Sequence, residues 1–241
     1  MSTVKTNTIL PDDPAQDITL GASGDTVTVA ADSIDINTVK DKGGNTLWTS
    51  DGAGNVSSVN AALTGNELLL TTNTFTGASS SEFTTKINST YDVYIFRMYD
   101  INPSANLAEI RFQVSSNGGT SYGMTITSTA WHAYNHETSG AEGLEYQTGQ
   151  DLAQSTDPQQ LCNGLGNGAD ESLAGEIHLF APSSTTYMKH FQSRVQFYQG
   201  SDYSEDFFIA GYINSTLAVN AIQFTPDSGT FDGTIKMYGL L

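Results

Sequence analysis

The chain has 241 residues, of which 38% are hydrophobic and 15% are charged. Nine Lys and Arg residues against 26 Asp and Glu residues give a formal net charge of −17, which disfavours nucleic acid and anionic membrane surfaces as partners, because both require a basic footprint. Eleven Tyr and eleven Phe residues argue against disorder in the second half of the chain, since disordered segments are poor in aromatic residues.

The N-terminal part of the chain has the composition of thin β-structure. Its only aromatic residue before position 60 is Trp48, and its alternating stretches, 25–29 and 34–39, are separated by Gly and Asn. Such strands cannot bury enough apolar surface by themselves to offset the entropy of ordering. Either the segment lacks a stable fold, or identical segments of sister chains supply the missing face. The second alternative predicts a homo-oligomer built around a shared axis.

A transition follows between residues 61 and 90. The run Leu68–Leu70 is strongly apolar and has the length of a buried strand. The stretch 74–81 is rich in Ser, Thr and Gly, which predicts a loop or hinge. We therefore expect the compact part of the chain to begin within this transition, at about residue 81.

Alternating apolar residues predict a series of strands in the rest of the chain. The segment 91–99 is apolar on both faces, which indicates a central position in a sheet. Turn chemistry at Pro226–Gly229 predicts that the last two strands form a β-hairpin. About eight strands with turn signals between them indicate an all-β fold, a β-sandwich of the jelly-roll-like kind. The predicted strands are 91–99, 109–114, 122–126, 176–180, 187–198, 207–213, 220–225 and 234–239.

The stretch 131–174 interrupts the series of alternating strands, because it is polar and rich in Gly. A loop of this length in a compact β domain is uncommon and is usually functional or disordered. Aromatic rings stack on the apolar faces of sugars while amides and carboxylates bind hydroxyl groups, which makes an aromatic and polar cluster a candidate glycan contact. The alternative is that these aromatic residues anchor the loop to the sandwich. The candidate residues are Trp131, Tyr134, Asn135, Glu137 and Tyr146.

No motif in the sequence points to catalysis or to a bound cofactor. His132 and His136 have the spacing of a metal pair on a helix, but their Gly-rich surroundings predict a loop. The stretch 51–55 resembles a fragment of a Ca²⁺ loop without its full ligand series, and a hairpin turn accounts for it. There is no Gly-x-Ser-x-Gly elbow, Walker loop or dinucleotide fingerprint. We therefore expect a protein that is not an enzyme, that binds no cofactor and that has no defined metal site, with Ca²⁺ at clustered carboxylates as the alternative explanation of the acidic charge.

Cysteine usage and the start of the chain indicate the compartment. Cys162 is the only cysteine, which excludes an intrachain disulfide and fits assembly in a reducing cytoplasm. We expect it to be a buried or loop thiol rather than a nucleophile. The sequence shows no basic-then-apolar signal pattern and no run approaching the roughly 18 apolar residues of a membrane span. We expect no membrane insertion, and release by lysis or within a particle.

Three segments resemble the virion fibre proteins of tailed bacteriophages, especially those of marine bacteria and cyanobacteria. Residues 2–9 resemble the N-terminal lead of such proteins, and residues 37–56 are similar to their shaft repeats. Residues 229–239 resemble the closing strand of their C-terminal β domain. The resemblance implies a homotrimer built into a virion, with a slender N-terminal part and a globular tip.

These patterns and the resemblance together predict a division of the chain. Residues 1–80 would form a particle-attachment and shaft segment, and residues 81–241 a β-sandwich tip domain. We expect a phage virion structural protein, assembled in the host cytoplasm, whose N-terminal segment joins other tail or capsid proteins. Its C-terminal domain would bind glycan on the host surface. An alternative of a different class is a capsid decoration protein or head fibre that stabilises the shell, and a third is a polysaccharide depolymerase.

Overall fold

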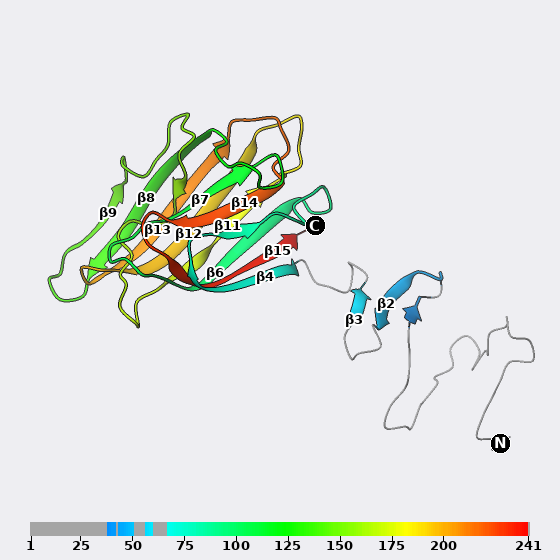
Figure 1. Ribbon diagram of the computed structural model, residues 1–241, viewed down its shortest axis with the longest axis horizontal. Helices are drawn as coiled ribbons and strands as arrows, with labels where there is room; N and C mark the ends of the chain where they lie inside the picture. Colours follow the sequence, from blue (N-terminus) through cyan, green and yellow to red (C-terminus); the bar gives the residue numbers. More distant parts are fainter. Residues whose placement is uncertain (1–37, 42, 51–55, 60–66, 241) are drawn as a thin grey trace, which may run out of the picture. The chain divides into compact units, whose positions relative to one another are not determined.

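The computed structural model shows two compact units, Met1–Leu63 and Thr64–Leu241. All regular structure in the described part of the chain is β-strand, so the all-β class is confirmed for it. Accordingly, the described residues include no helix long and apolar enough to cross a membrane. The structure describes residues 38–41, 43–50, 56–59 and 67–240 (Figure 1).

The first unit contains a small antiparallel sheet in the order β1-β2-β3. The Asp41 carboxylate accepts hydrogen bonds from the backbone and side-chain nitrogens of Asn45, at 2.9 and 3.0 Å. Gly44 takes a φ of +82°, which glycine adopts without steric cost. These residues form the tight connection between β1 and β2. The strands are β1 (Thr38–Lys40), β2 (Thr46–Ser50) and β3 (Val56–Val59).

The second unit is built from two antiparallel sheets (Figure 1). The large sheet has eight strands in the order β4-β15-β6-β11-β12-β13-β8-β9, and the small sheet has four in the order β10-β7-β14-β5. The edges of the large sheet are therefore β4 and β9. The strands are β4 (Glu67–Ala78), β5 (Ser81–Phe83), β6 (Val93–Pro103), β7 (Ile110–Ser115), β8 (Ile126–His136), β9 (Glu142–Tyr146), β10 (Gln159–Gln160), β11 (Leu173–Phe180), β12 (Lys189–Gln199), β13 (Tyr203–Ile213), β14 (Ala221–Pro226) and β15 (Phe231–Leu240).

The core lies between the two sheets and is filled by alternate residues of their facing sides. Phe112 of β7 meets Phe191 of β12 with ring centroids 5.1 Å apart. Phe224 of β14 meets Phe96 of β6 at 5.8 Å. Because each pair joins a strand of the small sheet to a strand of the large one, the two layers pack directly on each other. The predicted sandwich-like architecture is confirmed.

Several predicted strands are confirmed with the faces expected from alternation. The segment 91–99 corresponds to β6, which lies inside the large sheet between β15 and β11. Ile110, Phe112 and Val114 of β7 are all buried. The predicted strands 176–180, 187–198 and 207–213 correspond to β11, β12 and β13.

The predicted C-terminal hairpin is wrong. β14 and β15 flank a turn in which Gly229 has a φ of +68°, but the two strands do not pair with each other. β14 lies between β7 and β5 in the small sheet, whereas β15 lies between β4 and β6 in the large sheet. The turn therefore carries the chain from one layer to the other. Turn residues between two alternating segments are compatible with a hairpin and with a connection between two sheets. They therefore do not determine which strands pair.

Two segments predicted as loops contain strands. The stretch 131–174 includes the end of β8 together with β9 and β10, so the prediction of one long loop is wrong. The segment 74–81, predicted as a loop or hinge, lies mostly in β4, because its Thr residues suit a strand as well as a loop. Leu68 and Leu69, predicted to be buried, are exposed on this edge strand.

The position of β4 also bears on the predicted division of the chain. The boundary expected after residue 80 falls between β4 and β5. Since β4 pairs along its length with β15, residues 67–78 belong to the large sheet.

Candidate functional site

The candidate residues named from the sequence lie on or next to β8 and β9, which pair at one edge of the large sheet. Successive residues of a strand point to opposite faces, so Trp131 and Asn135 share the outer, solvent-facing side while Tyr134 points to the inner side. Tyr146 lies directly opposite Trp131, and Glu137 follows the end of β8 in a turn. The sheet therefore brings Trp131 and Tyr146 together and separates Tyr134 from them.

Trp131 belongs to a row of directly opposite residues that crosses the whole sheet. Trp131 lies opposite Phe208, and Phe208 lies opposite Arg194. Directly opposite residues have Cβ atoms about 5 Å apart, so each member of the row can contact the next. This cross-strand row consists of Tyr146, Trp131, Phe208, Arg194, Glu176, Arg97, Lys236 and Thr72, one residue from each of the eight strands.

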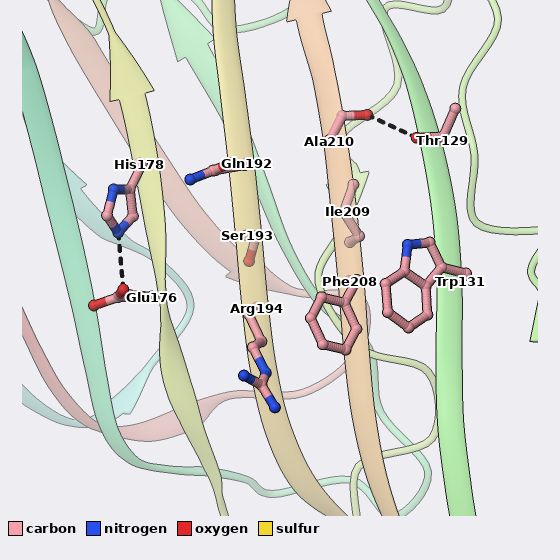
Figure 2. A pocket seen from close by; sticks show the side chains of 10 residues that line it. All are labelled: Thr129, Trp131, Glu176, His178, Gln192, Ser193, Arg194, Phe208, Ile209 and Ala210. Atoms are coloured by element: carbon pink, nitrogen blue, oxygen red, sulfur yellow. Dashed lines mark hydrogen bonds and ion pairs between the residues drawn. The ribbon is translucent and has the colours of Figure 1, made fainter. Parts of the chain in front are cut away.

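A hollow of about 380 Å³ lies beside the cross-strand row, on the outer face of β11, β12, β13 and β8. Figure 2 shows Phe208 and Trp131 on one side of it and His178 on the other. Between them lie Gln192 and Ala210, which are opposite each other on β12 and β13. Ala210 carries only a methyl group, and this leaves the room for the hollow. Glu176, Arg194 and Thr129 complete the ring of outward side chains.

The aromatic side of the hollow is a stack of side chains from three neighbouring strands. The rings of Trp131 and Phe208 lie 3.9 Å apart with an angle of 5° between their planes. The guanidinium carbon of Arg194, from the strand on the other side of β13, lies 4.8 Å from the Phe208 ring centroid. Nη2 of Arg194 also donates to Asp206 at 2.7 Å, which raises the pKa of Arg194. Trp131 remains 39% exposed, so the stack presents ring surface to solvent.

The opposite side of the hollow is held by ion pairs around Glu176. Its carboxylate accepts hydrogen bonds from Nε of Arg97 at 3.0 Å and from Nε2 of His178 at 2.8 Å. Burial works to raise the pKa of Glu176, but the bonds from His178 and Arg97 outweigh it and lower the pKa. Arg97 also donates to both carboxylate oxygens of Glu67, and its bonds to Glu176 and Glu67 raise its pKa. This network fixes His178 at the margin of the hollow.

The groups left free determine what the hollow can bind. Among the described residues, the Gln192 amide has no hydrogen-bond partner, and Arg194 uses Nε and Nη2 for Asp206 while Nη1 has no partner. A donor and acceptor amide, a guanidinium nitrogen and an imidazole thus lie beside an exposed aromatic surface. An apolar surface with a few convergent polar groups is the usual composition of a small-molecule site.

Tyr134 belongs to a second, smaller hollow of about 270 Å³ at the end of the inner face. There Nδ1 of His132 lies 3.0 Å from Oε2 of Glu205, and Nε2 of His132 faces the amide nitrogen of Gln147. Glu205 and Gln147 thus hold the His132 ring at its two nitrogens. Burial raises the pKa of Glu205 against the opposing effect of His132.

The predicted loop around His132 and His136 is wrong, because both residues lie on β8. Four residues of strand separate their Cα atoms by about 13 Å, so the two rings do not converge on one ion. Nδ1 of His136 instead accepts hydrogen bonds from the backbone amides of Thr138 and Ser139. In the described ranges, no group of three or more His, Cys, Asp or Glu side chains is placed to hold a metal ion.

No family model, curated protein or solved structure matches the chain, so the site rests on geometry. Of the five residues named from the sequence, Trp131 alone lines the hollow, and Tyr146 lies opposite it on β9. The lining residues Phe208, Arg194 and Gln192 were not named. One signal for Phe208 was present. It follows another Phe within an alternating strand, and one of two adjacent residues in such a strand must face outward.

Proposed function

We propose that the protein is a structural component of a bacteriophage virion, a trimeric fibre whose C-terminal sandwich binds glycan on the host surface. The observation that carries the proposal is the hollow on the outer face of the large sheet, where Trp131 and Phe208 stack beside the free amide of Gln192. Sugar rings offer apolar faces to aromatic side chains, and their hydroxyl groups bind amides, carboxylates and guanidinium groups.

The size of the hollow favours weak binding by each copy. Its volume of about 380 Å³ lies near the lower end of the range for ligand sites, about 300–1,000 Å³. It suits one sugar unit or a short oligosaccharide. Three copies on one fibre, and several fibres on one particle, would multiply such contacts and raise the avidity without any new contact.

The first unit supports the trimeric part of the proposal. Its described strands have three, five and four residues, and a sheet of this size needs a further hydrophobic face for independent stability. Sister chains around a common axis would supply that face. The similarity of residues 37–56 to fibre shaft repeats agrees with this arrangement. In the proposal, the residues before β4, rather than all of residues 1–80, attach the chain to tail or capsid proteins and form the shaft, because β4 belongs to the large sheet.

The order of the strands supports a jelly-roll-like tip domain. Along the chain, β5, β7, β10 and β14 of the small sheet alternate with strands of the large sheet. The chain therefore crosses repeatedly between the layers, as in other two-sheet folds with Greek-key connections. This arrangement leaves the outer face of the large sheet available for a ligand.

The direct test adds the purified chain to host cells before the phage that carries it. We expect the unaltered chain to block adsorption and the Trp131→Ala variant to lose the block. Tyr187→Ala is the matched control, because Tyr187 is an exposed aromatic residue outside the lining of the hollow. A chain that leaves adsorption unchanged, and whose loss instead makes the capsid sensitive to heat, would contradict the proposal and favour the decoration protein.

Light scattering of the intact chain tests the trimer separately. A mass of three chains is expected for the purified protein. A well-folded monomer whose residues 38–59 are protected from hydrogen exchange would contradict the proposed assembly.

A further inference from the structure

The basic residues of the second unit are concentrated in the cross-strand row. Residues 67–240 contain 18 Asp and Glu residues but only six Lys and Arg residues. Three of these six, Arg194, Arg97 and Lys236, lie in the cross-strand row. The other three are Lys86, Arg111 and the buried Lys189. A chain that is acidic overall thus places half of the cations of this unit along one line on one face.

The carboxylates that contact these cations are too few to make the row acidic. Asp206 pairs with Arg194, and Glu67 and Glu176 pair with Arg97. Lys236 forms no ion pair among the described residues, and its Nζ lies 5.2 Å above the ring of Tyr99. The charges of these three cations and three carboxylates cancel, whereas acidic residues greatly outnumber basic residues in the rest of the unit.

Two features leave positive charge available to a ligand. The side chain of Arg194 is 66% exposed, and Nη1 is not used by Asp206. Lys236 lies directly opposite Arg97 on the neighbouring strand and, unlike Arg97, has no carboxylate partner among the described residues. An acid group of a ligand can therefore pair with the ammonium group of Lys236.

We propose that the cross-strand row binds a linear polysaccharide with carboxylate-bearing sugars, laid across the strands, whose acid groups face Arg194, Arg97 and Lys236. The inference rests on the proposed function and specifies its ligand. One sugar packs against Trp131 beside the hollow, and the chain continues over β12, β11 and β6 towards β15.

The spacing of the row suits a polymer. Neighbouring strands lie about 4.8 Å apart, which is close to the length of one sugar unit in an extended chain. Arg194 lies two strands from Trp131, and Arg97 lies two strands from Arg194. The row from Trp131 to Lys236 spans five such steps, roughly 24 Å. Successive cations therefore meet sugars further along one chain, and longer oligosaccharides engage more of them.

The test titrates the intact chain by calorimetry with oligogalacturonides of two, four and six units. The same oligosaccharides with their carboxylates reduced to alcohols provide the matched neutral ligand. We expect the acidic hexamer to bind at least about tenfold more tightly than its reduced form. This advantage should shrink as salt is raised, because exposed charges are screened. Affinity should also rise with the length of the acidic oligosaccharide.

Two variants locate the contact. Arg194→Gln should weaken binding of all acidic lengths, and Lys236→Gln should weaken binding of the hexamer while leaving the dimer unchanged. Arg111→Gln is the control, because it removes the same charge from β7 of the small sheet. Arg194→Lys keeps the charge and should retain most of the preference for acid, which separates the ionic contribution from packing against Phe208.

The outcomes distinguish this inference from the proposed function. Equal affinity for acidic and reduced oligosaccharides, with both lost in Trp131→Ala, would overturn the acidic ligand and leave glycan binding intact. Binding of both forms that is insensitive to Trp131→Ala would overturn the location on this face. Binding of single-stranded DNA as tightly as of the acidic hexamer would show simple polyanion attraction and overturn the carbohydrate ligand. Failure to block adsorption would contradict the proposed function itself.

Discussion

Trp131 stacks face to face on Phe208, with ring centroids 3.9 Å apart and an angle of 5° between the planes. Removing the partner by Phe208→Ala should expose the indole and shift its fluorescence emission to longer wavelength. We expect a loss of about 1 kcal/mol in the free energy of unfolding, the usual contribution of an aromatic pair. Emission is measured in a Trp48→Phe background, since the chain has two Trp residues. An unchanged spectrum would contradict the stack.

A small residue is required where β11 lies against β12. A Cβ atom on Gly175 would lie 2.6 Å from Cα of Val195 and against the carbonyl oxygen of Arg194. Gly175→Ala should therefore push the strands apart and cost about 1–3 kcal/mol in the free energy of unfolding. The neighbouring exposed position provides the control, and Ala174→Ser should cost less than about 0.5 kcal/mol. Urea unfolding of both variants measures the difference. Equal midpoints would show that β12 accommodates the added methyl group with no loss in the free energy of unfolding.

Lys189 is a buried cation whose Nζ donates to the carbonyl oxygen of Ser215 at 3.0 Å. Among the described residues it has no carboxylate partner, and burial lowers its pKa. Because the folded chain binds this proton less tightly than the unfolded chain, stability should rise with pH from the lowered pKa up to about 10.4, the ordinary value for lysine. Lys189→Met, which removes the charge, should be more stable than the unaltered chain at pH 7.

The pH profile separates this effect from simple packing. The advantage of Lys189→Met should shrink as the pH rises through that window, because the lysine of the unaltered chain is then neutral in the fold. Urea unfolding from pH 6 to pH 10 measures it. An advantage that stays constant over this range would assign the effect to packing.

Cys162 should be inert in the folded protein. Its thiol is buried, and burial raises the pKa to about 12. The backbone amide of Ile110 donates to its sulfur at 3.2 Å. Since the thiolate is the reactive form, a thiol reagent at pH 8 should react with the unfolded chain and leave the native chain unmodified. Rapid modification of the native chain would mean that this part of the core opens readily.

The fold was predictable from the sequence as far as the direction of side chains, but not as far as strand partners. Ile222 and Ile235 face the core as their alternation predicted. Their neighbours across the sheets, Val114 and Met98 respectively, lie more than a hundred residues away in the chain. A local pattern carries no information about such pairings, which explains why two sound strand predictions gave a wrong hairpin.

The candidate site was predictable only where its residues lie close together in the sequence. Trp131 and Tyr146 belong to two strands joined by a short turn, and both were named. Phe208 and Arg194 reach the same place from strands that are separate in the sequence. Gly-rich flanks led to the prediction of a loop for β8. A strand that ends in polar residues beyond the core has the composition of a loop.

The position of β15 determines when the sandwich can be completed. This strand lies between β4 and β6, yet every other strand of the unit emerges from the ribosome before it. Until it arrives, β4 has no place in the large sheet, and β6 has an open edge. The domain must therefore close after its last strand is synthesised, through contacts of long sequence separation that slow folding. Deleting β15 would split the sheet rather than shorten it.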